Sequence, residues 1–178
     1  MDSWRSLGMT YFRRLLVAVL GAVSLVGAAS AGVSAHEGGT LVEFDSMTGV
    51  TASGVNLVND REIKAGGAPW VITSGTGEVD RQGNVHVEVV GLIIPTRTPP
   101  SNPVGTFRAT LSCLTPHGVM NVTTGPAVTG PAGNATIDGT VALPHPCKDP
   151  IVFVVNGTAS ATGGFAWFAM SNAEEDDD

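Results

Sequence analysis

The feature that most constrains the fold of this chain is a strict alternation of apolar and polar residues in several short segments. In the segment from Gly105 to Leu114, one face carries Phe107, Ala109, Leu111 and Cys113, and the other carries Thr106, Arg108, Thr110 and Ser112. The segments Val85 to Val89 and Asn134 to Leu143 repeat the pattern. A period of two residues is that of a half-buried β-strand, so these segments are predicted to be strands.

Further strands are predicted at Thr40–Asp45, Trp70–Ile72 and Val119–Thr123. The second of these is predicted to continue at Thr76–Val79, after a bulge at Gly75. A turn at Asp80 to Asn84 predicts a hairpin, and the unbroken apolar runs Ile151–Val155 and Phe165–Met170 predict strands covered on both faces. No stretch of the mature chain combines a helical period with capping signals. The sequence therefore predicts an all-β fold, a single β-sandwich (Ig-like or jelly-roll-like) of about eight strands, with a barrel as the alternative.

The two cysteines, Cys113 and Cys147, are predicted to form one disulfide, since the chain carries an export signal and cysteines in an oxidising compartment usually pair. Alternation places Cys113 on the inward face of its strand. Pro144, Pro146 and Pro150 surround Cys147, so it is predicted to lie in a stiff connection and not within a strand.

The first 35 residues are predicted to be a secretory signal peptide. Arginines precede an apolar run from Leu15 to Val26, and small residues follow it. The run is shorter than the roughly 20 residues that span a bilayer, so no membrane span is expected after cleavage. Cleavage is expected after Ala31 or after Ala35, and the second site leaves His36 as the new N-terminus. The folded domain is then predicted over residues 36–172.

The mature chain is acidic. Removal of residues 1–35 leaves six basic and 15 acidic side chains, a net charge near −9, of which five negative charges form the terminal run Glu174 to Asp178. This run is predicted to be a solvated, disordered tail over residues 173–178. A domain without clustered Lys and Arg is not expected to bind nucleic acid or an anionic membrane.

Two side chains are candidates for ligand binding. Trp70 follows the turn-forming residues Gly66 to Pro69 and is predicted to lie near a rim, where it would serve a carbohydrate-binding module as a stacking platform. His36, if it is the mature N-terminus, could chelate Cu(II) through its α-amine and imidazole, with a second histidine from His86, His117 or His145. Such a site is similar to the histidine brace of lytic polysaccharide monooxygenases and of periplasmic copper-carrier sandwiches. That resemblance implies a copper protein.

Catalytic patterns are weak. No serine lies in a nucleophile-elbow motif. The carboxylates Glu43, Asp45, Glu78, Glu88 and Asp138 fall on predicted outer faces or strand ends, where solvation is the simpler role. The blocks NPVGTFRATLSC, GNATIDGTVALPHPC and GGFAWFAM resemble those of small exported bacterial β-rich proteins of unassigned function, a resemblance that implies export and no particular reaction.

The sequence thus predicts a secreted, non-catalytic interaction module of the extracellular space or cell surface, with no cofactor. The segments Ser46–Ala68 and Pro95–Pro103 are expected to supply its binding loops, because long loops on a rigid sheet commonly carry recognition. A carbohydrate-binding module that uses Trp70 and a copper protein that uses His36 are the alternatives.

Overall fold

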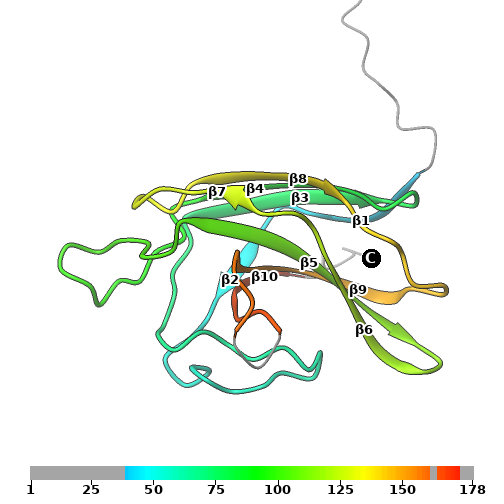
Figure 1. Cartoon of the computed structure of the whole chain (residues 1–178), viewed down its shortest axis with the longest axis horizontal. Helices are drawn as coiled ribbons and strands as arrows, with labels where there is room; N and C mark the ends of the chain where they lie inside the picture. Colours follow the sequence, from blue (N-terminus) through cyan, green and yellow to red (C-terminus); the bar gives the residue numbers. More distant parts are fainter. Residues whose placement is uncertain (1–38, 161–163, 173–178) are drawn as a thin grey trace, which may run out of the picture. The chain divides into compact units, whose positions relative to one another are not determined.

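In the part of the chain that the structure describes, ten antiparallel strands form two facing sheets, seen as the upper and lower layers of Figure 1. The computed structural model describes residues 39–160 and 164–172, which belong to one compact unit. The predicted signal peptide (1–35), His36 and the predicted acidic tail (173–178) lie outside the described residues. None of the described residues is helical, so this part of the chain contains no helix that could cross a bilayer.

The first sheet, sheet A, has the strand order β1-β3-β4-β8, with β1 (Thr40–Phe44), β3 (Ser74–Asp80), β4 (Asn84–Val90) and β8 (Ala135–Thr140). The second sheet, sheet B, has the order β2-β10-β9-β5-β6, with β2 (Met47–Gly49), β10 (Trp167–Ser171), β9 (Lys148–Asn156), β5 (Thr106–Thr115) and β6 (Gly118–Thr123). A short strand, β7 (Ala127–Val128), pairs with β5 beyond the end of β6. The predicted all-β sandwich is confirmed, and the barrel alternative is wrong, since two separate sheets form.

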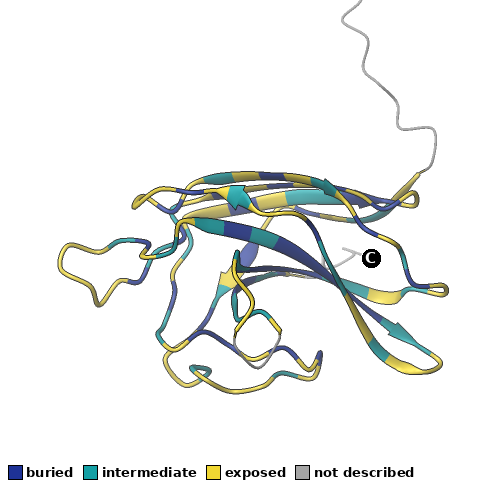
Figure 2. Cartoon of the chain, in the orientation of Figure 1, coloured by how far each residue is buried: buried dark blue, intermediate teal, exposed yellow. Residues whose placement is uncertain are grey.

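The core between the sheets follows the predicted alternation. On β4, Val85, Val87 and Val89 are buried while the residues between them are exposed. On β5, Phe107, Ala109, Leu111 and Cys113 point into the same core, and Val152 and Val154 of β9 join them. Figure 2 shows these buried stretches on the strands and exposed residues on the turns.

Sheet B is also covered on its other face, which the pure alternation of β5 does not predict. Residues 51–69, here called the crossing segment, lie over this outer face, below β9 and β10 in Figure 1. The residues on either side of the crossing segment are hydrogen-bonded to each other: the Trp70 amide donates to the Val50 carbonyl at 2.9 Å. The crossing segment is fixed to β10 by a parallel bridge between Ala65 and Trp167, and Ile63 packs on Phe153 and Val155 in a second apolar cluster. The fully buried run of β9 thus has apolar neighbours on both sides, as predicted.

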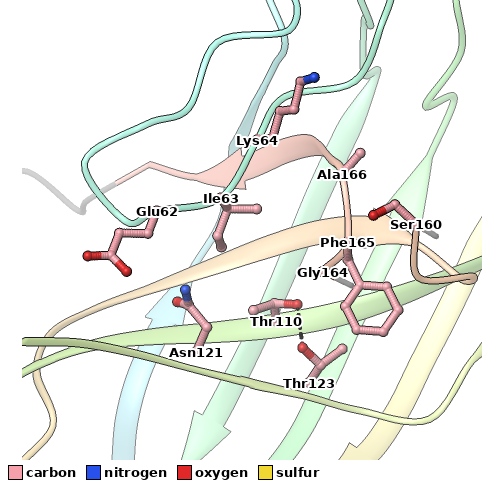
Figure 3. Close-up of a pocket in the computed structure, with 10 residues that line it drawn as sticks. All are labelled: Glu62, Ile63, Lys64, Thr110, Asn121, Thr123, Ser160, Gly164, Phe165 and Ala166. Atoms are coloured by element: carbon pink, nitrogen blue, oxygen red, sulfur yellow. Dashed lines mark hydrogen bonds between the residues drawn. The ribbon is translucent and has the colours of Figure 1, made fainter. Parts of the chain in front are cut away.

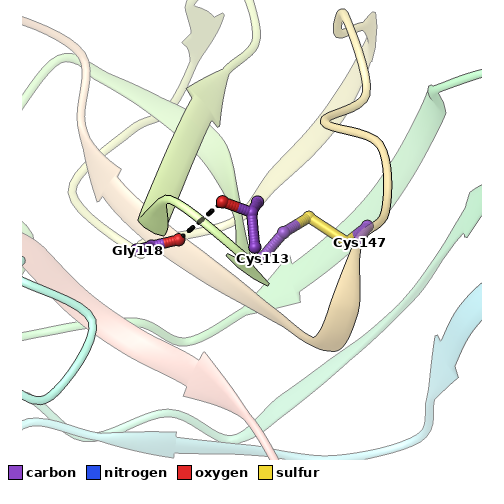
Figure 4. Close-up of a disulfide and its surroundings, with 4 residues drawn as sticks. Cys113, Gly118 and Cys147 are labelled. Carbon is purple, nitrogen blue, oxygen red and sulfur yellow. Dashed lines mark hydrogen bonds between the residues drawn. A yellow bond between two sulfur atoms is a disulfide. The ribbon is translucent and has the colours of Figure 1, made fainter.

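The predicted disulfide is confirmed. Cys113 on β5 bonds to Cys147 with a Cα–Cα distance of 4.8 Å, and Cys147 lies in the connection that leads into β9 (Figure 4). The two cysteines are 34 residues apart in sequence, and their bond joins the C-terminal part of β5 to the start of its neighbour β9. It is consistent with an oxidising compartment.

Several predicted details are wrong. The strand count rises from about eight to ten because β2 and β7, of three and two residues, carry no alternation long enough to detect. Residues 70–72 form no strand, only an isolated bridge between Val71 and Ile93. Gly75 is not a bulge: it pairs in register with Val89, and the absence of a side chain makes room for Met47, whose Cγ would lie 2.6 Å from a Cβ there.

Candidate functional site

A groove of about 450 Å³ lies on the outer face of sheet B, between the crossing segment and the described residues 160 and 164–166 that lie between β9 and β10 in the sequence (Figure 3). Its floor is formed by Thr110 of β5 and by Asn121 and Thr123 of β6. One rim carries Glu62, Ile63 and Lys64, and the opposite wall carries Ser160 and residues 164–166. Its volume falls within the range of about 300 to 1,000 Å³ of small-molecule sites in proteins.

The floor is polar because it is made of the side chains that alternate with the core residues of β5 and β6. Thr110 and Thr123 are register partners, and their hydroxyls share a hydrogen bond of 2.8 Å. Asn121 donates from Nδ2 to the Arg61 carbonyl at 2.9 Å, which ties the crossing segment to β6. The floor therefore offers hydrogen-bonding groups whose positions are fixed by the sheet.

The wall contains a half-buried aromatic ring, Phe165. The Arg108 guanidinium lies over this ring, with Cζ 5.3 Å from the centroid. Arg108 is itself fixed, since Nε donates to the Gly157 carbonyl at 2.9 Å and Nη1 donates to the Thr124 carbonyl at 2.7 Å. The cation thereby fixes the ring. Figure 3 shows the Phe165 ring among the residues that line the groove.

The rim is a tight turn organised by Asn59. Its Oδ1 accepts from the backbone amides of Arg61 and Ile63, each at 3.0 Å. Within this turn Glu62 has φ of 61°, a left-handed conformation that disfavours a residue with a side chain. The turn presents Glu62 and Lys64 as exposed side chains of opposite charge at the rim and buries Ile63 between them.

Sheet A presents a different polar surface. Across its four strands, Glu43, Glu78, His86 and Asp138 occupy one row in register. His86 Nδ1 lies 2.6 Å from Asp138 Oδ1, and this hydrogen bond raises the pKa of His86 above its ordinary value, with smaller support from the charges of nearby carboxylates. Within the described residues, no group of three His, Cys, Asp or Glu side chains could hold a metal ion.

The structure corrects the placement of Trp70. The side chain is 4% exposed and stacks on Phe168, with ring centroids 4.1 Å apart, in the core between the sheets. The preceding glycines do not mark a rim: Gly66 lies beside both rings, where a Cβ would come within 3.0 Å of each. Trp70 as an exposed stacking platform is therefore wrong, because burial of so large an apolar ring stabilises the fold more than exposure does.

Of the other predicted residues, His36 lies outside the described residues. His86, His117 and His145 are exposed, as expected for each of them. The segment Ser46–Ala68 supplies one rim of the groove, whereas Pro95–Pro103 supplies no lining residue. The groove residues themselves were missed by sequence reasoning, although the unusual number of Thr and Asn side chains on the outer face of β5 and β6 was visible.

Comparison with known proteins finds no relative: no protein-family model matches the chain, no curated protein matches it, and no solved structure matches it.

Proposed function

We propose that this protein is a secreted, non-catalytic binding module of the extracellular space or cell surface, and that the groove on the outer face of sheet B is its ligand-binding surface. The observation that carries the proposal is that two connecting segments fold onto one face of a rigid sheet and leave a groove between them. Loops held by a rigid scaffold are where such folds commonly place recognition.

Binding is favoured over catalysis by the chemistry of the lining. Among the described residues that line the groove, Glu62 is the only carboxylate, and none is a histidine or cysteine. A hydrolytic pair of two carboxylates or a hydroxyl activated by an imidazole would need such partners. The hydroxyls of Thr110 and Thr123 bond to each other and have no base beside them in this set.

The compartment is supported by two independent features. The N-terminal sequence has the pattern of an export signal, and the Cys113–Cys147 disulfide is consistent with an oxidising environment. Intact mass spectrometry of the exported protein under non-reducing conditions tests this part. We expect a mass that lacks residues 1–35 or 1–31 and is two hydrogens lighter than the reduced chain; a full-length or fully reduced mass contradicts it.

Cell-surface binding is tested with the mature protein and washed cells of the organism that produces it. The fraction that pellets with the cells is measured for the wild type, for Lys64→Ala at the groove rim, and for Arg81→Ala. Arg81 is an exposed cation in the turn between β3 and β4 of the opposite sheet, so its substitution matches the change in charge away from the groove. Selective loss of retention in Lys64→Ala is expected. Equal retention of both variants excludes the groove, and no retention of the wild type excludes surface binding.

A further inference from the structure

The chemistry of the groove indicates a class of ligand. Its most specific element is the Phe165 ring, which lines the groove while Arg108 lies over it at 5.3 Å. Because Nε and Nη1 of Arg108 donate to backbone carbonyls, the guanidinium that lies over the ring is fixed in place. A fixed aromatic face suits a ligand that is itself flat and apolar on one side.

The floor suits a ligand that carries hydroxyls on its edges. In the Thr110–Thr123 pair one hydroxyl proton is used between the two side chains, so one proton and several oxygen lone pairs remain. Asn121 gives one amide hydrogen to the Arg61 carbonyl and has a second donor and an acceptor on the same amide. The floor therefore combines donors and acceptors at short spacing on the face of a sheet.

Two other ligand classes fit less well. An extended peptide that adds a strand pairs along a sheet edge, and although β6 is the edge strand of sheet B, the groove floor is the face of β5 and β6 and not that edge. A phosphate or sulfate group calls for several cations. The rim offers Lys64 beside Glu62, whose opposite charges cancel, and Arg108 is not among the residues that line the groove.

We propose that the groove binds a neutral saccharide, with one sugar ring stacked on Phe165 and its hydroxyls hydrogen-bonded to Thr123 and Asn121. Sugars present an apolar face of C–H groups and a perimeter of hydroxyls, which matches the wall and the floor. At the open end, the exposed Glu62 carboxylate accepts from one sugar hydroxyl and the exposed Lys64 ammonium donates to another. This inference rests on the groove being the binding surface proposed above.

The test is a glycan array that holds neutral, acidic and amino-sugar oligosaccharides, probed with the mature protein. We expect binding to neutral glycans that does not weaken as salt is raised, since screening acts on charged partners. Phe165→Leu keeps apolar volume in the wall but removes the aromatic face, and we expect it to weaken binding about tenfold. Phe165→Trp keeps an aromatic face and is expected to retain binding.

Val128→Ala is the matched control, because Val128 is an apolar side chain that is 82% exposed on β7 and lines no part of the groove. Thermal melting of each variant establishes that it is folded. Absence of binding to every glycan, binding to acidic glycans alone, or equal binding by wild type and Phe165→Leu overturns the saccharide assignment. The effect of Lys64→Ala on retention by cells is measured separately. If only the saccharide assignment fails, the proposal of a binding module therefore still stands.

Discussion

Ser112 and Thr110 make a paired test of how sheet B is covered. Both lie on β5, two residues apart and on the same outer face, and they are 0% and 2% exposed. The Thr110 hydroxyl has the Thr123 hydroxyl as its partner at 2.8 Å. The Ser112 hydroxyl is buried with no hydrogen-bond partner. Two neighbouring hydroxyls in one environment thus differ in whether they are satisfied.

The expected changes in stability have opposite signs. A buried polar group without a partner costs about 1 to 3 kcal/mol, so Ser112→Ala is expected to raise the free energy of unfolding by about 1 kcal/mol. Thr110→Val keeps the shape but deletes a hydrogen bond and leaves Thr123 without its partner, and it is expected to lower the free energy by about 1 kcal/mol. The two variants should therefore differ by about 2 kcal/mol.

Urea unfolding of the wild type and the two variants, followed by tryptophan fluorescence at equal m-values, measures this difference. For a domain of this size, melting temperatures are expected to move apart by about 4 to 8 °C in total. If Ser112→Ala is destabilised as much as Thr110→Val, the Ser112 hydroxyl has a partner such as a buried water, and the reasoning is wrong.

Three further predictions follow from named contacts. The double variant Cys113→Ala/Cys147→Ala is expected to lose about 3 to 4 kcal/mol of stability in urea unfolding, from the loop that the disulfide closes; a loss below about 1 kcal/mol would contradict this. The Asp138 hydrogen bond raises the pKa of His86, so its stabilisation is fully present below pH 6.5 and is lost as the pH rises through the folded-state pKa. Both side chains are largely exposed, so the effect is at most about 0.5 kcal/mol, and Asp138→Asn should flatten the pH profile of stability. Glu62→Gly relieves a left-handed φ of 61° and should leave the melting temperature unchanged or higher, whereas an ordinary surface glycine substitution would lower it.

The sandwich was predictable wherever a strand has one face in the core and one in water. The alternation of β4 and the inward face of β5 gave the correct face for every residue from Val85 to Val89 and placed Cys113 inward. The hairpin between β3 and β4 was predictable from its turn, in which Asp80 Oδ1 accepts from the amides of Gln82 and Asn84. These signals are local, so a single sequence contains them.

The crossing segment was not predictable, because no local pattern shows what a loop rests on. Residues 51–69 are punctuated by glycines and read as a solvent-exposed loop, but Ile63 and Ala65 are buried against β9 and β10. The same cause explains Trp70: the chain returns from the outer face into the core within a few residues, and Gly49 allows the Trp70 backbone to pass where any side chain would collide with its carbonyl.

The location of the groove, however, follows from an asymmetry that the sequence does contain. On β9 the run from Val152 to Val155 is buried on both faces, which requires a cover on the outer side of sheet B. On β5 and β6 the outward side chains next to that run are instead Thr110, Asn121 and Thr123. The crossing segment packs its apolar Ile63 on β9, whereas over β6 it is held by a hydrogen bond from Asn121 to the Arg61 carbonyl. The groove therefore lies at the boundary between the part of the outer face that carries apolar residues and the part that carries polar ones. Its floor is polar because it is made of the outward side chains of β5 and β6.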